Sequence, residues 1–196
     1  MMVKICGITN RADALAAIAG GASALGFNFW PPSPRYIEVA AAAELLAALP
    51  AGPLKVGLFV NEAAAYIDAV ARRLGLDVVQ IHGECGVPAH VRVWKAYSVT
   101  EGFDIGKLDD SAEAFLLDAP AGERCGGTGE TFDWTLVRGV RKRIVLAGGL
   151  GPDNVRRAIE TVHPWGVDAC SRLESAPGKK DHPRMAAFLK AALEQP

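Results

Sequence analysis

The sequence carries almost no net charge, because 21 Lys and Arg residues stand against 22 Asp and Glu residues. A chain without an excess of either sign gives no electrostatic reason to expect nucleic acid or a membrane surface as a partner. It also lacks a charged leader followed by a cleavable apolar run, and any apolar stretch as long as a membrane-spanning helix. We therefore expect a cytoplasmic protein that holds any anionic ligand through a local site.

Cysteine is scarce as well, with four residues in a chain of 196. Cys6, Cys85, Cys125 and Cys170 are far apart and form no C-x-x-C pair, so neither a disulfide scaffold nor a zinc site is expected. The chain has no Walker motif and no complete G-x-G-x-x-G motif, which argues against a nucleotide cofactor. We expect reduced thiols, no metal and no organic cofactor.

Hydrophobic residues, in contrast, make up half of the chain. This is enough to build one well-buried domain over residues 1–196 and too little for two. Short apolar runs rich in β-branched residues predict eight strands. These runs are VKICG, ALGFNF, LKVGLFV, DVVQIHG, VRVWKAY, AFLLDA, RIVLAGG and GVDACS.

Helix-like segments lie between many of these runs. The predicted helices are Arg11–Ala19, Glu38–Leu49, Glu62–Leu74, Pro152–Thr161 and Pro183–Leu193. Asn61 is the predicted N-cap of the third helix, and Asp181 precedes the last. Pro152, just after Gly151, marks the start of the fourth. The connections after the fourth, fifth and sixth strands are expected to be short, with weak or broken helices.

The alternation of buried strands and helices predicts a parallel sheet, because parallel strands need crossover connections. Eight such units predict a closed (β/α)₈ barrel, in a trimmed form since about 250 residues is typical of that fold. The predicted fold class is therefore α/β, a TIM barrel with some shortened helices. A doubly wound open sheet is the alternative, favoured by the small size of the chain but not by the number of strands.

Catalytic groups in such a barrel lie at the C-terminal ends of the strands. Cys6 ends the first strand, and Lys4 precedes it by two residues and therefore shares its inward face. A nearby cation lowers the pKa of a thiol toward neutrality, which favours a reactive thiolate. The alternatives are that Cys6 is a buried packing residue and that Lys4 pairs with an interior carboxylate.

Asp118 ends the apolar run AFLLDA. A buried carboxylate is costly without a partner, so this side chain either forms a pair or keeps a proton that it can donate. The alternative is an aspartate that caps a helix or braces a loop. The segment GERCGGTGE follows almost at once, and its Gly126, Gly127, Thr128 and Gly129 predict a flexible loop beside the site.

Three further strand ends carry residues that suit ligand binding. Gly148 and Gly149 end a strand just before a helix, where backbone N–H groups can hold a phosphate, although a plain turn is the alternative. Arg35 follows a stiff proline-bearing loop, which favours capture of a carboxylate or phosphate over a solvated surface position. His82 shares a strand face with Gln80, so it contributes either a polar wall or a group for proton transfer.

Several of these motifs occur together and in order, from residue 4 to about residue 181. They are KICGIT, GFNFWPPSPRYI, VGLFVN, QIHGE, LLDA followed by GGTGETFDW, LAGGLGPDNV and VDACSRLESAPGKKD. In this combination the chain resembles the phosphoribosylanthranilate isomerase family of tryptophan biosynthesis. The agreement of several separate motifs makes the resemblance specific, whereas any one motif alone is weak.

The resemblance implies a (β/α)₈ barrel enzyme without a metal or organic cofactor. The implied reaction is the Amadori rearrangement of N-(5'-phosphoribosyl)anthranilate to 1-(2-carboxyphenylamino)-1-deoxyribulose 5-phosphate. By resemblance, Cys6 is the general base and Asp118 the general acid. Arg35 contacts the anthranilate carboxylate and Asp168 the amine and ribose, and we place His82 with these two substrate-binding residues. The expected partner is this small phosphosugar substrate, bound by a monomer or a homodimer.

The phosphate is assigned by resemblance to Gly148, Gly149 and the turn that contains Ser171. Here the chain departs from the family pattern Ser-Ser-Gly-Val-Glu, because it reads CSRLE from residue 170. The missing glycine weakens a backbone contact to phosphate, or Arg172 replaces that contact with a charged donor. The sequence leaves both possibilities open, and we include Arg172 among the phosphate-binding residues.

Two other hypotheses remain at this stage. The first is a different phosphosugar enzyme on the same barrel, such as an indoleglycerol phosphate synthase or a ribulose phosphate epimerase, because the fold alone does not fix the function. The second is a non-catalytic phosphate-binding or structural barrel. That hypothesis gains if Cys6 and Asp118 lie too far apart to serve one substrate.

Overall fold

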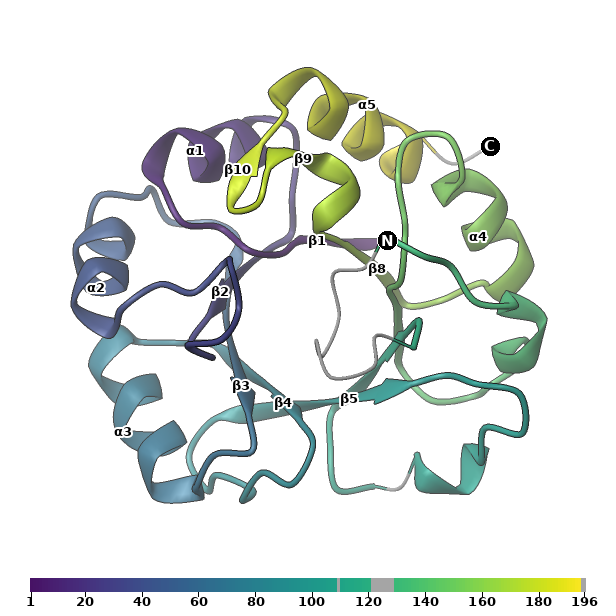
Figure 1. Ribbon diagram of the computed structural model, residues 1–196, viewed down its shortest axis with the longest axis horizontal. Helices are drawn as coiled ribbons and strands as arrows, with labels where there is room; N and C mark the ends of the chain where they lie inside the picture. The colour runs from purple at the N-terminus through teal and green to yellow at the C-terminus, as the bar shows by residue number, and fades with distance from the viewer. Residues whose placement is uncertain (109, 121–128, 195–196) are drawn as a thin grey trace.

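Eight parallel strands close into a barrel in the computed structural model, which describes residues 1–108, 110–120 and 129–194 (Figure 1). The strands are β1 (Met2–Ile5), β2 (Ala24–Asn28), β3 (Leu54–Val60), β4 (Val78–His82), β5 (Arg92–Ser98), β6 (Ala114–Asp118), β7 (Ile144–Leu146) and β8 (Gly166–Ala169). Each strand pairs with its sequence neighbour, and β1 also pairs with β8. The predicted (β/α)₈ barrel is confirmed, and the alternative of an open doubly wound sheet is wrong.

Helices surround the ring of strands (Figure 1). They are α1 (Arg11–Ala19), α2 (Val39–Ala47), α3 (Ala64–Leu74), α4 (Val155–Val162) and α5 (His182–Leu193). Between β4 and β5 the chain forms no helix, while β5 is followed by a single 3₁₀ turn, η1 (Ile105–Lys107). Another 3₁₀ turn, η3 (Trp134–Val137), precedes β7. The prediction of short connections in this part of the barrel is therefore confirmed over the described residues.

Two of the predicted helix starts differ from the structure. Helix α3 begins after Ala63, whereas Asn61 adopts a left-handed conformation (φ 53°) and its side-chain oxygen accepts a hydrogen bond from Glu84 N at 2.8 Å. Asparagine tolerates this conformation and often braces loops, so Asn61 ties two loops together instead of capping a helix. Helix α4 begins three residues later than predicted, after Asn154, so that Pro152 lies in the preceding turn.

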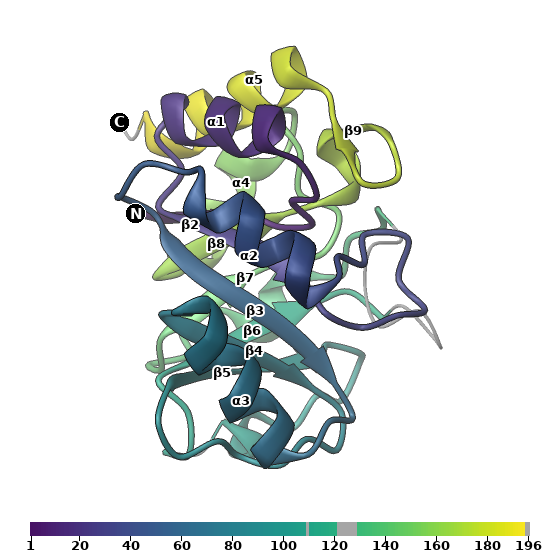
Figure 2. The same ribbon diagram turned by 90° about the vertical axis from the view of Figure 1, so that its left-hand side faces the viewer.

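The predicted cap of the last helix is confirmed. Asp181 accepts a hydrogen bond from Arg184 N at 3.0 Å, with Pro183 in the first turn of α5. Before this helix the chain makes a short antiparallel hairpin of β9 (Glu174–Ala176) and β10 (Lys179–Lys180). Viewed from the side, the N-terminus lies toward one end of the barrel and β9 toward the other, where the parallel strands end (Figure 2).

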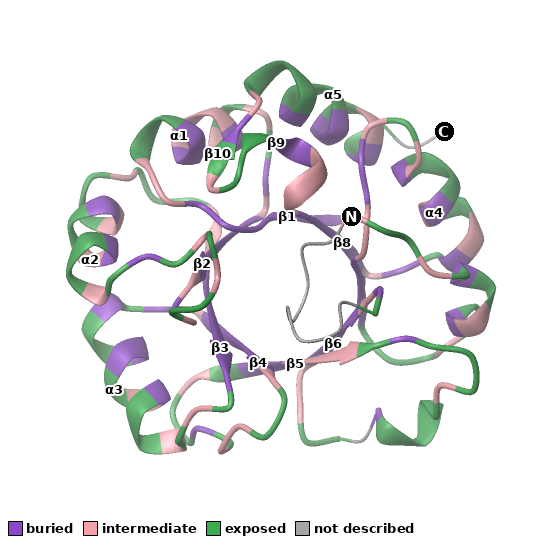
Figure 3. Cartoon of the chain, in the orientation of Figure 1, coloured by how far each residue is buried: buried purple, intermediate pink, exposed green. Residues whose placement is uncertain are grey.

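The strand side chains alternate between two environments. Val3 and Ile5 belong to the large core between the sheet and the helices, where buried faces of the helices meet the buried strands (Figure 3). A second cluster inside the barrel consists of Met2, Ala24, Val56, Val78, Trp94, Ala114, Leu116, Val145 and Ala147. Lys4, Gln80 and Asp168 are buried polar residues on the same inward register. The barrel is thus packed with apolar side chains toward the strand starts and becomes polar toward the strand ends.

Candidate active site

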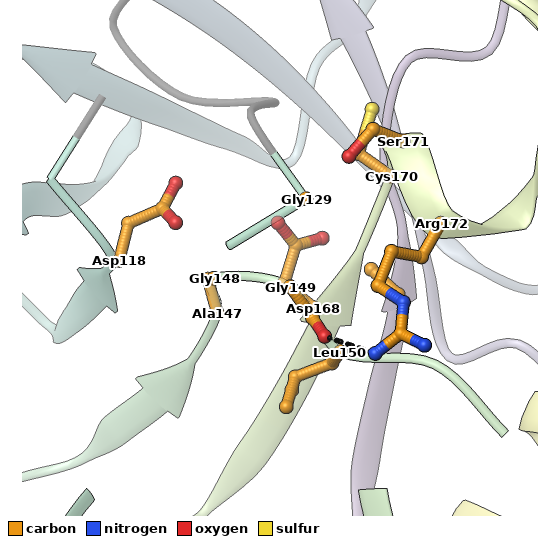
Figure 4. Close-up of a pocket in the computed structure, with 11 residues that line it drawn as sticks. Asp118, Gly129, Ala147, Gly148, Gly149, Leu150, Asp168, Cys170, Ser171 and Arg172 are labelled. Atoms are coloured by element: carbon orange, nitrogen blue, oxygen red, sulfur yellow. Dashed lines mark hydrogen bonds between the residues drawn. The ribbon is translucent and has the colours of Figure 1, made fainter. Parts of the chain in front are cut away.

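A pocket opens where the strands end, between β6, β8 and the loops that follow β7 and β8 (Figure 4). It is lined by residues 118, 129, 147–150 and 168–172. Both Asp118 and Asp168 contribute carboxyl groups to this pocket. Cys170 also lines it and packs against the adjacent hydrophobic cluster that contains Cys6. The structure therefore brings residues from the first, sixth and eighth strands to one end of the barrel.

Lys4 and Asp168 form an ion pair inside the barrel. Lys4 Nζ lies 2.9 Å from Asp168 Oδ1, and the lysine side chain is fully buried. Burial opposes the lysine charge, but the charge of Asp168 and, less strongly, that of Cys6 outweigh it and raise the pKa of Lys4. The expected pairing of Lys4 with an interior carboxylate is confirmed. Lys4 is consequently a fixed positive charge next to Cys6.

Cys6 has the environment of a reactive thiolate. The hydrogen bond from Cys170 is the largest cause that lowers the pKa of Cys6 to about 6; burial opposes this shift and the charge of Lys4 supports it. Room for the sulfur comes from Gly26 on β2, where a Cβ would lie 2.9 Å from Cys6 Sγ and 3.0 Å from Lys4 Cε. At neutral pH Cys6 is therefore a thiolate in most of the molecules.

Asp118 has the opposite tendency. Burial is the largest cause that raises its pKa to about 7, and the charges of Asp168 and Cys6 raise it further. The amide of Ala119 donates to Asp118 Oδ1 at 2.8 Å and, with the charge of Lys4, opposes the shift. Asp118 therefore holds a proton over much of the neutral range. Cys6 is not among the residues that line the pocket, but it packs in one cluster with Cys170, which lines the pocket together with Asp118.

His82 is not among the residues that line this pocket, and its imidazole ring is neutral near pH 7. Burial, helped by the charge of Lys4, lowers the pKa of His82 to about 4. Its Nε2 atom lies 2.8 Å from Gln80 Nε2, so the neutral ring accepts the amide hydrogen there. Of the two roles left open by the sequence, this environment favours a polar wall over proton transfer.

Arg35 reaches the site but has a protein partner. Its Nη2 lies 2.7 Å from Glu174 Oε2, and its Nε lies 3.2 Å from both Glu174 oxygens. Glu174 also accepts from Lys180 Nζ at 3.0 Å. Gly7 (φ 73°) makes this approach possible, since a Cβ there would lie 2.9 Å from Arg35 Cγ and 3.0 Å from Cys170 Sγ. The sequence predicted Arg35 but missed its partner Glu174 and the lysine that shares this carboxylate, Lys180, both on the β9–β10 hairpin.

The two glycines after β7 sit where a side chain does not fit. A Cβ on Gly148 (φ 84°) would lie 2.5 Å from Ala119 N, and one on Gly149 (φ 58°) would lie 2.6 Å from Glu130 O. Across the pocket, Ser171 begins the short 3₁₀ turn η4 (Ser171–Leu173). These backbone segments form the end of the pocket at which the sequence predicts phosphate.

Arg172 joins the two loops at this end. Its Nη1 donates to Gly149 O at 3.0 Å, and its Nη2 lies 2.9 Å from both carboxylate oxygens of Asp153 (Figure 4 shows the bond to Gly149). The guanidinium is thus already engaged with protein acceptors. Of the predicted flexible loop, Gly129 lines the pocket, and Gly126, Gly127 and Thr128 lie outside the described residues.

The sequence placed Cys170 in the turn expected to hold phosphate but did not predict its contact with Cys6. Cys170 is 164 positions from Cys6, yet Cys6 N donates to Ala169 O at 3.0 Å and so places the two cysteines side by side at the β1–β8 seam. The pKa of Cys170 is raised, first by its hydrogen bond to Cys6 and then by burial. The pairing of first and last strands that every closed barrel requires is the signal that could have revealed this contact.

Fold and site together define the class of protein, a (β/α)₈ barrel with a polar pocket at the ends of its strands. A family model described as N-(5'-phosphoribosyl)anthranilate (PRA) isomerase matches residues 3–191. The chain belongs to this family.

Individual relatives agree with the family match. The N-(5'-phosphoribosyl)anthranilate isomerase of Solibacter usitatus is 54% identical over 196 residues, covering 98% of this chain and 97% of the relative. That of Pelobacter propionicus is 46% identical over 201 residues, with 98% and 95% coverage. The crystal structure of the Thermotoga maritima enzyme superposes with a TM-score of 0.88 at 40% identity, covering 98% of both chains.

A second solved structure bears on the ligand. It is a phosphoribosyl anthranilate isomerase in complex with reduced 1-(o-carboxyphenylamino)-1-deoxyribulose 5-phosphate, with a TM-score of 0.85, 39% identity and 98% coverage of both chains. In the present chain, no helix among the described residues is long and apolar enough to cross a membrane.

Proposed function

We propose that this chain converts N-(5'-phosphoribosyl)anthranilate to 1-(2-carboxyphenylamino)-1-deoxyribulose 5-phosphate in tryptophan biosynthesis, with Asp118 as general acid and Cys6 as general base. One observation carries the assignment: the two groups share an environment in which the pKa of Cys6 falls to about 6 while that of Asp118 rises to about 7. Near neutral pH this leaves one group able to accept a proton and the other able to donate one.

Asp118 acts first, by protonating the ribose ring oxygen so that the ring opens to an iminium. A carboxylic acid can do this only if it is still protonated near neutral pH, and burial beside Asp168 supplies that condition. As the proton leaves, the carboxylate that forms is stabilised by the Ala119 amide and by the charge of Lys4.

Cys6 acts second, by removing the proton from C2 of the open-chain iminium to give an enolamine, which tautomerises to the keto product. The thiolate is supported by Lys4 and by the hydrogen bond from Cys170. Asp168 pairs with Lys4 in turn, so the lysine can stay buried and charged without the free-energy cost of an unpaired buried charge. Its carboxylate also lines the pocket, which supports a contact with the substrate's amine and ribose.

The remaining residues position the two ends of the substrate. The phosphate would lie against Gly148, Gly149 and Ser171, with Arg172 holding their two loops in place. Glu174 occupies the Nε and Nη2 side of Arg35, and within the described residues this leaves Nη1 to bind the anthranilate carboxylate. Such two-point anchoring can remove several kcal/mol from the barrier by alignment of the reacting groups.

Loss of substrate fluorescence during turnover tests the proposal. Cys6→Ala and Asp118→Asn should each reduce the rate by about a hundred- to ten-thousandfold, as removal of a general acid or base does. Cys85→Ala, a thiol replacement outside the pocket lining, should retain wild-type turnover. Unchanged rates in both site variants would reject the assignment, and an inactive wild-type chain would favour the hypothesis of a non-catalytic barrel.

The state of assembly stays open between a monomer and a homodimer. One relative, from Thermotoga maritima, is described as a dimeric isomerase from which monomers were generated. We propose that a monomer is competent for catalysis, since one barrel carries both the proposed acid, Asp118, and the proposed base, Cys6. Sedimentation at assay concentrations, combined with the fluorescence assay, tests this.

A further inference from the structure

Cys6 and Cys170 are the two thiols that the mouth of the barrel brings together. Strands β1 and β8 pair Ile5 with Ala169, and each cysteine is the first residue after its strand. Neighbouring strands lie about 4.8 Å apart, which falls within the roughly 4.4–6.8 Å that separates the Cα atoms of a disulfide. Both side chains belong to one hydrophobic cluster. Backbone spacing and side-chain direction are thus both suited to a bond between the sulfurs.

We propose that Cys6 and Cys170 form a reversible disulfide when the protein meets a peroxide, which makes this pair a redox modification site. The mechanism above uses Cys6 only as a base and Cys170 only as its hydrogen-bond donor, and neither role requires a second oxidisable sulfur at this place. Cys85, by comparison, bonds to the backbone oxygen of His82 and packs away from this cluster.

The first step is oxidation of Cys6. The Cys6 thiolate attacks one oxygen of hydrogen peroxide, the O–O bond breaks, and hydroxide leaves. The new S–O bond carries the transferred OH group, so Cys6 becomes a sulfenic acid and its sulfur loses two electrons to the peroxide. The released hydroxide takes up the proton that the Cys6 thiol had given, which forms the first water. Lys4 favours this step because it keeps the attacking sulfur in its thiolate form.

The second step depends on Cys170. In the reduced protein the negative charge of Cys6 keeps Cys170 protonated. Conversion of Cys6 to a neutral sulfenic acid removes this charge, so the pKa of Cys170 is no longer raised by it. Lys180 Nζ, 3.8 Å from Cys170 Sγ, then favours the Cys170 thiolate. This thiolate attacks the Cys6 sulfur, an S–S bond forms, the S–O bond breaks, and hydroxide takes up the proton that Cys170 gave. Overall, two thiols and one peroxide give a disulfide and two waters.

Disulfide formation removes the catalytic thiolate, so it inhibits the enzyme until a dithiol reduces the bond. This consequence rests on the proposed function of Cys6, whereas the bond itself does not. The bond also protects Cys6, because a sulfenic acid without a neighbouring thiol goes on to sulfinic acid, which dithiols do not reverse.

The test treats the full-length protein with a small excess of hydrogen peroxide, blocks remaining thiols with N-ethylmaleimide, and maps the peptides by mass spectrometry without reduction. We expect a peptide pair joined through Cys6 and Cys170, with the loss of two hydrogen atoms. Activity should fall in step with this cross-link and return on treatment with dithiothreitol. The Cys85→Ser and Cys125→Ser variants, as matched controls, should form the same cross-link.

Cys170→Ser and Cys170→Ala remove the second thiol. Both should lose the cross-link, gain two oxygen atoms on Cys6 with peroxide, and fail to recover activity with dithiothreitol. Wild-type protein in which Cys6 becomes sulfinic acid without a cross-link, or joins Cys85 or Cys125 instead, would overturn the proposal even if the variants did not fold. A cross-link that forms without loss of activity would instead contradict the assigned role of Cys6 and leave the redox site standing.

Discussion

Lys4 Nζ and Asp168 Oδ1 lie 2.9 Å apart across the β1–β8 seam, and the charges of both residues act on Cys6 and on Asp118. Lys4 favours the charged form of both groups, whereas Asp168 opposes it. Because the lysine is neutralised by a partner that faces the same pocket, the site keeps Cys6 ionised without forcing Asp118 to ionise as well. The ion pair therefore helps to separate the two protonation states that the proposed reaction needs.

Breaking this pair from one side should destabilise the fold. In Lys4→Met, Asp168 remains buried without its partner, which typically costs about 3–5 kcal/mol. The double variant Lys4→Met/Asp168→Leu removes both charges and should recover most of that loss. Urea unfolding of the single and double variants measures the effect, and equal stability of Lys4→Met and wild type would show that the pair is not buried as described.

The rate should depend on pH through both groups. Activity rises as pH increases through about 6, because Cys6 must lose its proton, and falls above about 7, because Asp118 must keep its own. The profile of kcat/KM against pH is therefore expected to be a narrow bell whose two apparent pKa values belong to the coupled pair. A flat profile between pH 5 and pH 9 would contradict this description.

Asp118→Asn should stabilise the protein at alkaline pH while it lowers the rate. The pKa of Asp118 is about 7 in the folded chain and about 3.9 in an unfolded one, so its contribution to stability is complete below about pH 4 and is lost as pH rises through 7. Asparagine does not titrate, so the variant does not lose stability in this way as pH rises. The advantage of the variant should thus grow between these pH values and reach on the order of 4 kcal/mol.

Denaturant unfolding at pH 4, 6 and 8 tests this sign. Glu160→Gln, on the exposed face of α4, is a matched control that should show no such trend. An Asp118→Asn variant that is less stable than wild type at pH 8 would show that the buried carboxylate has compensating partners.

Removal of the Arg172 side chain should weaken phosphate binding. Its bonds to Gly149 and Asp153 hold the two loops at one end of the pocket, and charge-assisted hydrogen bonds contribute about 1.5–3 kcal/mol each. Solvent screening at this partly exposed site removes about half of that energy. We therefore expect KM to rise about tenfold with a smaller change in kcat. Arg141→Ala, an exposed arginine after η3, is the control.

Inorganic phosphate provides an independent check. If Arg172 holds the phosphate end, competitive inhibition by phosphate should weaken in Arg172→Ala in proportion to the rise in KM. A change confined to kcat would place the role of Arg172 elsewhere.

Local patterns were sufficient to predict the barrel and much of the site. The apolar runs located all eight barrel strands, and the position of Cys6 and Asp118 at strand ends follows once the barrel is assumed. The Lys4–Cys6 relationship could be predicted because it depends only on the two-residue period of a strand. A sequence thus predicts relationships between residues that are close together within one regular element.

Relationships between distant segments could not be predicted in this way. Cys170 contacts Cys6 only because strand β8 closes against β1. Glu174 contacts Arg35, and Lys180 contacts Cys170, because a hairpin before α5 carries both residues to this end of the barrel. The Asn61 prediction was wrong for a related reason: its side chain is taken by the amide of Glu84, from a different loop. Nothing in the local sequence distinguishes this bracing role from a helix cap.

The separate roles of the two catalytic groups are tested most directly by the kinetic isotope effect of substrate deuterated at ribose C2. If Cys6 removes that hydrogen, Cys6→Ser should make its transfer fully rate-limiting and show a larger isotope effect than wild type. Asp118→Asn should show little or none, because ring opening then limits the rate. A larger isotope effect in Asp118→Asn than in Cys6→Ser would contradict the assignment of base and acid.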